Sequence, residues 1–142
     1  LVATGAGVLV LVRTSNPGAR DVQDLELAGG GPLWERLAGI VAGLGTPGES
    51  GLADVGAVVG ATEPWHLPRA RELMPHAIFL LPGVGAQGGR VEDLAPAFGP
   101  GRAGGLVTAS RSIAAAHEAD GSEPAAAARR AAERLRELAW SL

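Results

Sequence analysis

Hydrophobic and polar positions follow the same order four times along the chain. In each unit a short apolar run is followed by a segment whose apolar residues recur at helical spacing. Continuous apolar runs rich in β-branched residues are typical of strands buried on both faces, as in a parallel sheet. The predicted strands are residues 7–12, 55–62, 78–82 and 105–109. The predicted helices are residues 32–45, 64–74 and 91–98 and a long segment that starts at 124.

The last helix has the clearest signals. Ser122 can cap its N-terminus, and Pro124 suits its first turn. One face of this helix is predicted to hold Ala128, Ala131, Leu135, Leu138 and Leu142. By contrast, residues 19–32 are mixed and glycine-rich, which predicts a loop with at most a short helical turn.

Strands that alternate with helices predict an α/β fold with a parallel sheet. A complete (β/α)8 barrel, or TIM barrel, takes roughly 250 residues. Four units in 142 residues therefore correspond to about half of such a barrel. Neither an internal repeat nor a linker divides the chain, so one domain is expected.

The composition narrows the possible functions. A hydrophobic content of 46% with 19% charged residues indicates a folded globule. The formal charge of −3 gives no electrostatic reason to expect a nucleic-acid partner. The sequence has no cysteine, which excludes disulfides and thiolate chemistry in these residues. No apolar run approaches the roughly 20 residues of a membrane span, so we expect a cytoplasmic protein without a membrane partner.

All twelve basic residues are arginine, so these 142 residues contain no lysine. Any mechanism that requires a lysine must take it from elsewhere. The sequence also begins at Leu1, not at methionine, shortly before the first predicted strand. This start leads us to expect that a segment upstream has been removed.

The ends of the third and fourth predicted strands carry the strongest candidate chemistry. The third strand runs into the glycine-rich segment 83–89, and the fourth is followed by Ser110 and Arg111. Glycine lets backbone N–H groups approach a ligand closely, and a guanidinium can grip a phosphate at two points. Two adjacent strand ends hold a phosphate in many (β/α)8 barrels. The alternative is that these are ordinary turns and that Arg111 is a solvated charge.

The glycines of the first segment also match the dinucleotide fingerprint, as Gly83-x-Gly85-x-x-Gly88. That fingerprint opens the first strand–helix unit and is followed after about 20 residues by an acid for the ribose. Here two units precede it, and the next strand ends in Ser110-Arg111 without an acid. A nicotinamide-binding domain therefore stays only as a minor alternative.

Other polar residues supply binding groups but no reaction chemistry. Ser15, Thr62, Gln87 and Arg111 all follow predicted strands and are expected to face one cavity. The histidines do not form a metal set, and we expect structural or solvated roles for His66, His76 and His117. The tryptophans are expected to cover the wall of the barrel; they are Trp34, Trp65 and Trp140. We find no convincing acid, base or nucleophile.

Four motifs together resemble a known family. Segments 13–18 (Arg-Thr-Ser-Asn-Pro-Gly), 58–62 (Val-Val-Gly-Ala-Thr), 81–89 (Leu-Pro-Gly-Val-Gly-Ala-Gln-Gly-Gly) and 109–113 (Ala-Ser-Arg-Ser-Ile) are similar, in this order, to orotidine 5′-phosphate decarboxylases. The bacterial subgroup with Thr-Ser-Asn-Pro fits best. The resemblance covers essentially the whole chain and implies that residues 1–142 are the last four units of a single (β/α)8 barrel, its carboxyl-terminal half.

The resemblance also implies roles for six residues. Ser15 would hydrogen-bond the pyrimidine, and Gln87 would bridge the base side and the phosphate. Arg111, with the backbone N–H groups of Ser110 and Arg111, would bind the phosphate, while Pro82 and Val84 would line the pocket. The substrate would be orotidine 5′-monophosphate (OMP), without a cofactor or metal. The full-length protein would be a homodimer.

The chain departs from the family in one respect. The family's Asp-x-Lys-x-x-Asp motif is absent, and no lysine replaces the one that protonates the carbanion left by carbon dioxide. The resemblance assigns this motif to the missing half, so we predict that these residues alone are inactive. The alternative from another functional class is a stand-alone phosphate-binding half-barrel.

Overall fold

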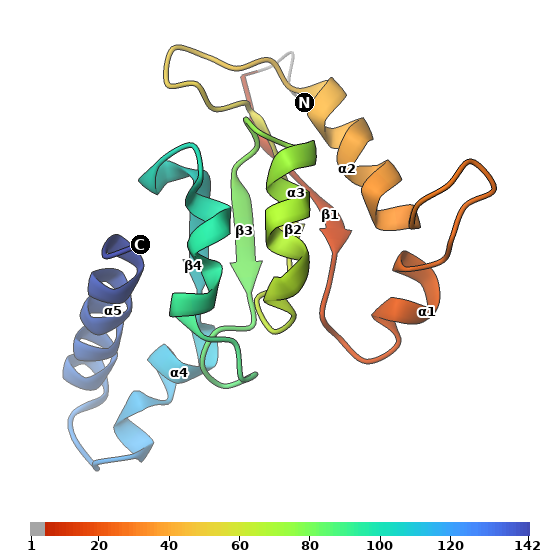
Figure 1. Cartoon of the computed structure of the whole chain (residues 1–142). Helices are drawn as coiled ribbons and strands as arrows, with labels where there is room; N and C mark the ends of the chain where they lie inside the picture. The colour runs from red at the N-terminus through yellow and green to blue at the C-terminus, as the bar shows by residue number, and fades with distance from the viewer. Residues whose placement is uncertain (1–4) are drawn as a thin grey trace.

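The structure, a computed structural model, describes residues 5–142 and contains one parallel sheet of four strands (Figure 1). The opening residues Leu1–Thr4, on which the prediction of a removed upstream segment depends, lie outside the described residues. The strands pair in the order in which they occur along the chain. They are β1 (Val8–Arg13), β2 (Val55–Val59), β3 (Phe79–Pro82) and β4 (Gly105–Thr108).

Helices follow each strand. The α-helices are α1 (Ala19–Gln23), α2 (Leu33–Leu44), α3 (Leu67–Leu73), α4 (Ser110–Ala114) and α5 (Pro124–Trp140). Short 3-10 helices fill the other connections; they are η2 (Pro64–His66), η3 (Val91–Phe98), η4 (Arg102–Gly104) and η5 (Ala116–Glu118). The carboxyl ends of the strands meet at one edge of the sheet, the lower edge in Figure 1, where α1 and α4 begin.

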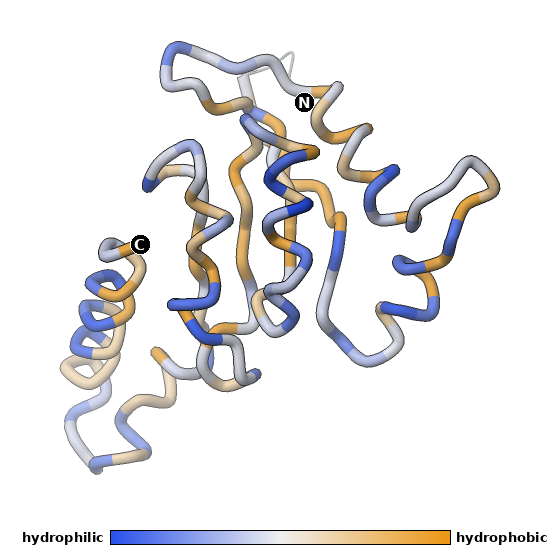
Figure 2. Tube along the Cα trace, in the orientation of Figure 1, coloured by the Kyte–Doolittle hydropathy of each residue, from blue (hydrophilic) through white to orange (hydrophobic). Residues whose placement is uncertain are grey.

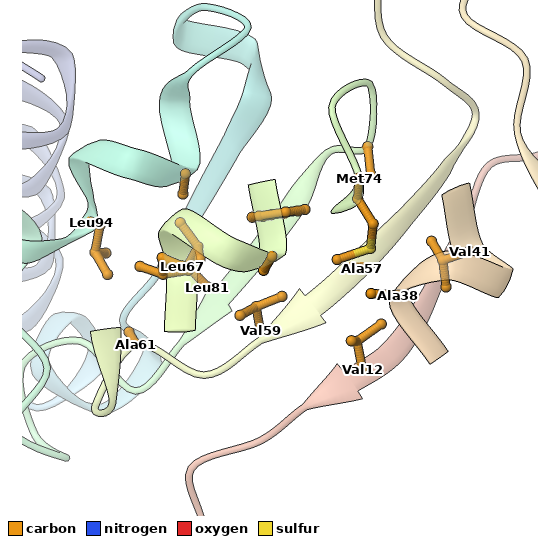
Figure 3. Packing of buried hydrophobic residues seen from close by; sticks show 14 of the residues in the cluster. Val12, Ala38, Val41, Ala57, Val59, Ala61, Leu67, Met74, Leu81 and Leu94 are labelled. Atoms are coloured by element: carbon orange, nitrogen blue, oxygen red, sulfur yellow. The ribbon is translucent and has the colours of Figure 1, made fainter. Parts of the chain in front are cut away.

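The core lies between the sheet and the helices that cover one of its faces (Figures 1 and 3). Val12 of β1 packs near Ala38 of α2, and Ala57 of β2 lies beside Met74 at the end of α3 (Figure 3). These side chains are all completely buried. Hydrophobic residues concentrate along the strands, while the helices alternate between hydrophobic and hydrophilic positions (Figure 2). The apolar runs therefore form the predicted strands, and the helical periodicity gives each helix one buried side.

The sequential strand order bears on the dinucleotide alternative. A doubly wound domain reverses its strand order at a switch point, and the dinucleotide binds in the crevice there. In residues 5–142 the order β1-β2-β3-β4 contains no reversal. The glycine pattern of 83–88 follows the third strand, not the first. This arrangement favours a barrel segment over a nicotinamide-binding domain.

Several predicted boundaries were wrong. β2 ends at Val59, so residues 60–62 form a turn and not the end of a strand. The segment 64–74 divides into η2 and α3. Helix α4, which begins directly after β4, was not predicted, because five residues are too few to show helical periodicity.

The long helix α5 also differs from its prediction. Its cap is Glu123, whose carboxylate accepts hydrogen bonds from the N–H groups of Ala125 (3.0 Å) and Ala126 (2.8 Å). Ser122 instead accepts a hydrogen bond from Arg130 through its hydroxyl. On the predicted apolar face, Ala128, Ala131 and Leu135 are half-buried, but Leu138 and Leu142 are exposed. Helix α5 packs against α4, η5 and η3, and among residues 5–142 it is the last element of the chain.

Among residues 5–142, no helix covers the second face of the sheet (Figure 1). We call it the open face; alternation along β1 and β4 places Leu9, Leu11 and Leu106 on it. Their exposed fractions are 43%, 54% and 47%. In a closed barrel this face would be the packed interior. Strands β1 and β4 are also the two edges of the sheet.

We expect the isolated 142-residue chain to form dimers or aggregates. Unpaired strand edges are templates for pairing with another chain, and the open face adds exposed leucines. Analytical ultracentrifugation at tens of micromolar checks this expectation. A compact monomer at that concentration would contradict it.

Candidate functional site

The ends of β3 and β4 enclose a small pocket of about 100 Å³. Five of the six residues singled out in the sequence line it. The lining consists of Pro82, Gly83, Val84, Ala86, Gln87, Thr108, Ala109, Ser110 and Arg111. The pocket therefore joins two motifs that are more than twenty residues apart in the sequence, at the edge of the sheet where ligands bind in β/α folds.

The segment 83–89 owes its shape to its glycines. Gly83 and Gly85 have φ angles of +108° and +76°, which side-chain-bearing residues rarely adopt. A Cβ on Gly85 would lie 2.6 Å from Oγ of Ser112, so glycine is also needed for α4 to approach. Within the loop, the Gly85 N–H donates to the Gly89 carbonyl and the Gly88 N–H to the Gly85 carbonyl. These N–H groups bond within the loop, so the glycines shape the pocket more than they supply donors to it.

The start of α4 is the part of the pocket with free donors. Its N-cap, Ala109, makes no side-chain capping bond. The first N–H groups of a helix have no partner within the helix, so those of Ser110 and Arg111 are available at the pocket. The Arg111 side chain is exposed and forms no ion pair with any residue of 5–142. One cation and two helix-terminal N–H groups suit an anion.

Ser15 and Thr62 do not line this pocket, so the predicted single cavity is only partly formed by these residues. Ser15 lies after β1 and packs against Gly60. A Cβ on Gly60 would lie 2.5 Å from Oγ of Ser15. Thr62 lies beside the loop 83–89. Its Cγ2 is 3.1 Å from the position that a Cβ on Gly83 would take. The strand ends thus form a row, with Ser15 at β1 and the pocket between β3 and β4.

A charged cluster at the ends of β1 and β2 was missed in the sequence. Arg13 is completely buried and bonds the carboxylates of Asp24 and Glu63. Glu63 also binds Arg20 at 2.5 Å. Burial raises the pKa of Glu63, but the hydrogen bond from Arg20 and the charges of Arg13 and Arg20 outweigh burial, and the net pKa is lowered. The only sequence signal was an arginine at the end of an apolar strand.

His66 is the other buried polar residue, and it has a structural role as predicted. Its ring lies edge-on to Trp34 and Trp65, with centroid distances of 6.1 and 5.3 Å. Neither ring nitrogen has a hydrogen-bond partner among residues 5–142. Burial, followed by the positive charge of Arg13, lowers the pKa of His66 from 6.5 to about 4. The imidazole is therefore neutral in the folded protein at neutral pH.

Acid should destabilise the fold through His66. Between pH 6.5 and about 4 the unfolded chain binds a proton at this histidine and the folded chain does not, so stability falls as pH falls. The full difference corresponds to about 3 kcal/mol of unfolding free energy. Urea unfolding of the full-length protein at several pH values measures it. His66→Leu should flatten the pH dependence of the unfolding free energy in this range, whereas His76→Asn should not. The same pH dependence in His66→Leu and wild type would contradict the attribution of the effect to His66.

The remaining aromatic and histidine residues are partly as predicted. Trp34 is 3% exposed and covers the sheet, but Trp65 and Trp140 are more than half exposed, so their predicted role was wrong. The exposed ring of Trp140 lies 4.9 Å from the guanidinium of Arg102. In the part of the chain that the structure describes, no three His, Asp or Glu side chains are grouped to hold a metal ion. No described helix has the length and apolarity needed to cross a membrane.

Comparison with curated proteins gives many sequence relatives. Orotidine 5′-phosphate decarboxylase of Deinococcus radiodurans is 47% identical over 136 residues, which are 94% of this chain and 46% of the relative. The enzyme of the same name from Haloarcula marismortui is 52% identical over 112 residues, or 79% of this chain and 38% of the relative. Across eight of the curated relatives that it matches, the chain spans between 29% and 48% of the relative's length. No family model matches the chain.

Solved structures agree with the sequence relatives. OMP decarboxylase of Leishmania donovani matches with a TM-score of 0.66 and 30% identity, over 94% of this chain and 48% of that one. UMP synthase of the same organism matches with a TM-score of 0.68 and 33% identity, over 94% and 28%. The fold prediction is confirmed, since the chain forms part of a (β/α)8 barrel. The resemblance stated from the motifs is confirmed at the level of these homologues, while the bacterial subgroup stays a prediction.

Proposed function

We propose that this chain is the carboxyl-terminal half of an orotidine 5′-phosphate decarboxylase, which converts OMP to uridine 5′-monophosphate (UMP) and carbon dioxide. One observation carries the proposal: two motifs of the sequence form one pocket at the ends of β3 and β4. Its wall contains a helix N-terminus and the guanidinium of Arg111, which pairs with no acid of residues 5–142. Relatives of that name match along nearly the whole chain. We include in the proposal a cytoplasmic homodimer for the full-length protein and the subgroup with Thr-Ser-Asn-Pro.

In the proposed complex the pocket holds the phosphate. The guanidinium of Arg111 makes two charge-assisted hydrogen bonds to it, and the N–H groups of Ser110 and Arg111 add two more. Pro82 and Val84 form the apolar side of the pocket. Gln87 reaches from the phosphate toward the base.

Ser15 completes the site from the end of β1. Because β2 lies between β1 and β3, the ligand must extend across the strand ends from the phosphate pocket to Ser15. A nucleotide is extended in this way, with its phosphate and its base at opposite ends. We therefore assign recognition of the pyrimidine to Ser15. The Ser15 hydroxyl would donate a hydrogen bond to the ring or accept one from it.

The chemical step belongs to residues outside this chain. Loss of carbon dioxide breaks the bond between C6 and the carboxylate and leaves the electron pair on C6. A lysine ammonium then gives its proton to C6, and the chain holds no lysine. The contribution of these 142 residues is binding energy from the distant phosphate, which holds the reacting ring in place.

The open face fits the same proposal. Leu9, Leu11 and Leu106 are exposed on it, and four further strands of a barrel would bury them. The lengths of the relatives are consistent with a partial barrel, since the chain spans less than half of the relatives from Deinococcus radiodurans and Haloarcula marismortui. We infer that residues 1–142 are half of one domain and not a domain of their own.

Decarboxylation of OMP by the full-length protein tests the proposal. The absorbance of the orotate ring should change with time, and the protein should act far more slowly on orotidine, which lacks the phosphate. A full-length protein that binds UMP but does not decarboxylate OMP would contradict the proposed activity. That result would favour a phosphate-binding module.

A further inference from the structure

Arg13 departs from the alternation of its strand. In β1 the side chains of Leu9 and Leu11 lie on the open face, and alternation would place Arg13 on the same face. The pairing with β2 shifts register between Leu11 and Arg13, and both Val12 and Arg13 are completely buried. Irregularities of this kind re-aim a side chain and are frequent beside functional sites. Here the guanidinium is turned toward the acids that follow α1 and β2.

This guanidinium joins three segments at the carboxyl edge of the sheet. Its Nε and Nη2 donate to the two carboxylate oxygens of Asp24, at 2.8 and 3.0 Å. Nη2 also donates to Glu63, at 2.8 Å. Asp24 directly follows α1, and Glu63 lies between β2 and η2. Nη1 donates to the carbonyl of Thr14. The end of β1 is thereby fixed to both neighbouring connections.

Thr14, the residue after Arg13, is also held by hydrogen bonds. The Thr14 N–H donates to Oε1 of Gln23 at 2.8 Å, and Nε2 of Gln23 donates back to the Thr14 hydroxyl at 3.1 Å. Ser15 comes next and packs against Gly60, where only glycine leaves room for it. The N–H of Gly60 in turn donates to the Arg13 carbonyl at 2.8 Å. The place of the Ser15 hydroxyl is thus set by the two residues before it and the glycine beside it.

We propose that Arg13 is a positioning residue for the pyrimidine. Through its hydrogen bonds to Asp24 and Glu63 it holds Ser15 at the place where the base is recognised. This inference rests on the proposed function, which assigns the pyrimidine to Ser15. A buried ion pair contributes little net stability compared with apolar residues of similar volume. Its geometry, however, fixes the strand end in one arrangement. Because Arg13 is completely buried, it acts in this proposal through Ser15 and not through a contact of its own with the ligand.

Arg71 provides a matched control within the same chain. It too is an arginine with several internal bonds, but it lies at the other end of the sheet, where the strands begin. Its guanidinium donates to backbone carbonyls, among them Ala77 at 2.7 Å and Gly104 at 3.1 Å, and packs 3.8 Å from the ring centre of Phe79. Substitution of Arg71 should therefore lower stability without acting on Ser15.

Binding of two ligands to the full-length protein tests the role of Arg13. UMP has both phosphate and base, whereas ribose 5-phosphate lacks the base. Arg13→Gln should weaken UMP binding by about tenfold and leave ribose 5-phosphate within about twofold, as expected when one hydrogen bond to the base is lost. Arg71→Gln should lower Tm and leave the ratio of the two affinities unchanged.

A double-mutant cycle separates positioning from a merely structural effect. In a Ser15→Ala background, Arg13→Gln should weaken UMP binding by no more than about twofold further, because the contact through which it acts is already gone. If Arg13→Gln does not fold, Asp24→Asn weakens the hydrogen bonds of Arg13 and serves in the same cycle. Equal losses for both ligands, or additive losses with Ser15→Ala, would overturn the role of Arg13. A wild-type protein that binds UMP no better than ribose 5-phosphate would overturn the pyrimidine contact, and the proposed function with it.

Discussion

Replacing Arg111 with alanine in the full-length protein should weaken the binding of UMP by at least a hundredfold. The Arg111 guanidinium lines the pocket and forms no ion pair with a described residue, so its hydrogen-bonding capacity is available to a ligand. Each charge-assisted hydrogen bond contributes roughly 1.5–3 kcal/mol, and two of them correspond to on the order of a hundredfold or more. Isothermal titration calorimetry measures the change.

The control for Arg111 is a ligand without the phosphate. Binding of uridine should hardly change in Arg111→Ala. Arg111→Lys should recover only part of the UMP affinity, because an ammonium cannot reproduce the planar fork of a guanidinium. Equal losses for uridine and UMP would show that Arg111 has a general structural role.

The isolated 142-residue chain should not decarboxylate OMP above the uncatalysed rate. It has twelve arginines and no lysine, and a guanidinium holds its proton too tightly to be a good proton donor near neutrality. The open face also leaves the site without the half of the barrel that would exclude water. Release of labelled carbon dioxide from OMP measures the rate.

The matched protein for this test is the full-length one, which under the proposed function also contains the lysine. That protein should release carbon dioxide, and the 142-residue chain at the same concentration should not. Turnover by the short chain alone would contradict the assignment of the proton donor to the missing half.

The sequence was most informative where its patterns are local. Apolar runs and helical periodicity predicted the strands and the main helices. The glycines of 83–89 and the Ser110-Arg111 pair indicated a pocket at adjacent strand ends, because a parallel sheet brings its carboxyl ends together. The structure places five of the six singled-out residues in one pocket.

The sequence was least informative where distant residues determine the outcome. The register shift that buries Arg13 depends on pairing with β2 and on acids 11 and 50 residues away. Likewise, nothing in the sequence shows that His66 is enclosed by Trp34 and Trp65. Helix α4 is too short to have a periodic pattern, and only the geometry shows that its N-terminus faces the pocket.

A crystal structure of the full-length protein with UMP tests the central claim most directly. We predict that the phosphate lies in the pocket between β3 and β4, bonded to the Arg111 guanidinium and the N–H groups that open α4. The uracil ring should extend past the end of β2 and contact the Ser15 hydroxyl. A phosphate bound elsewhere, or a uracil ring directed away from Ser15, would contradict the account.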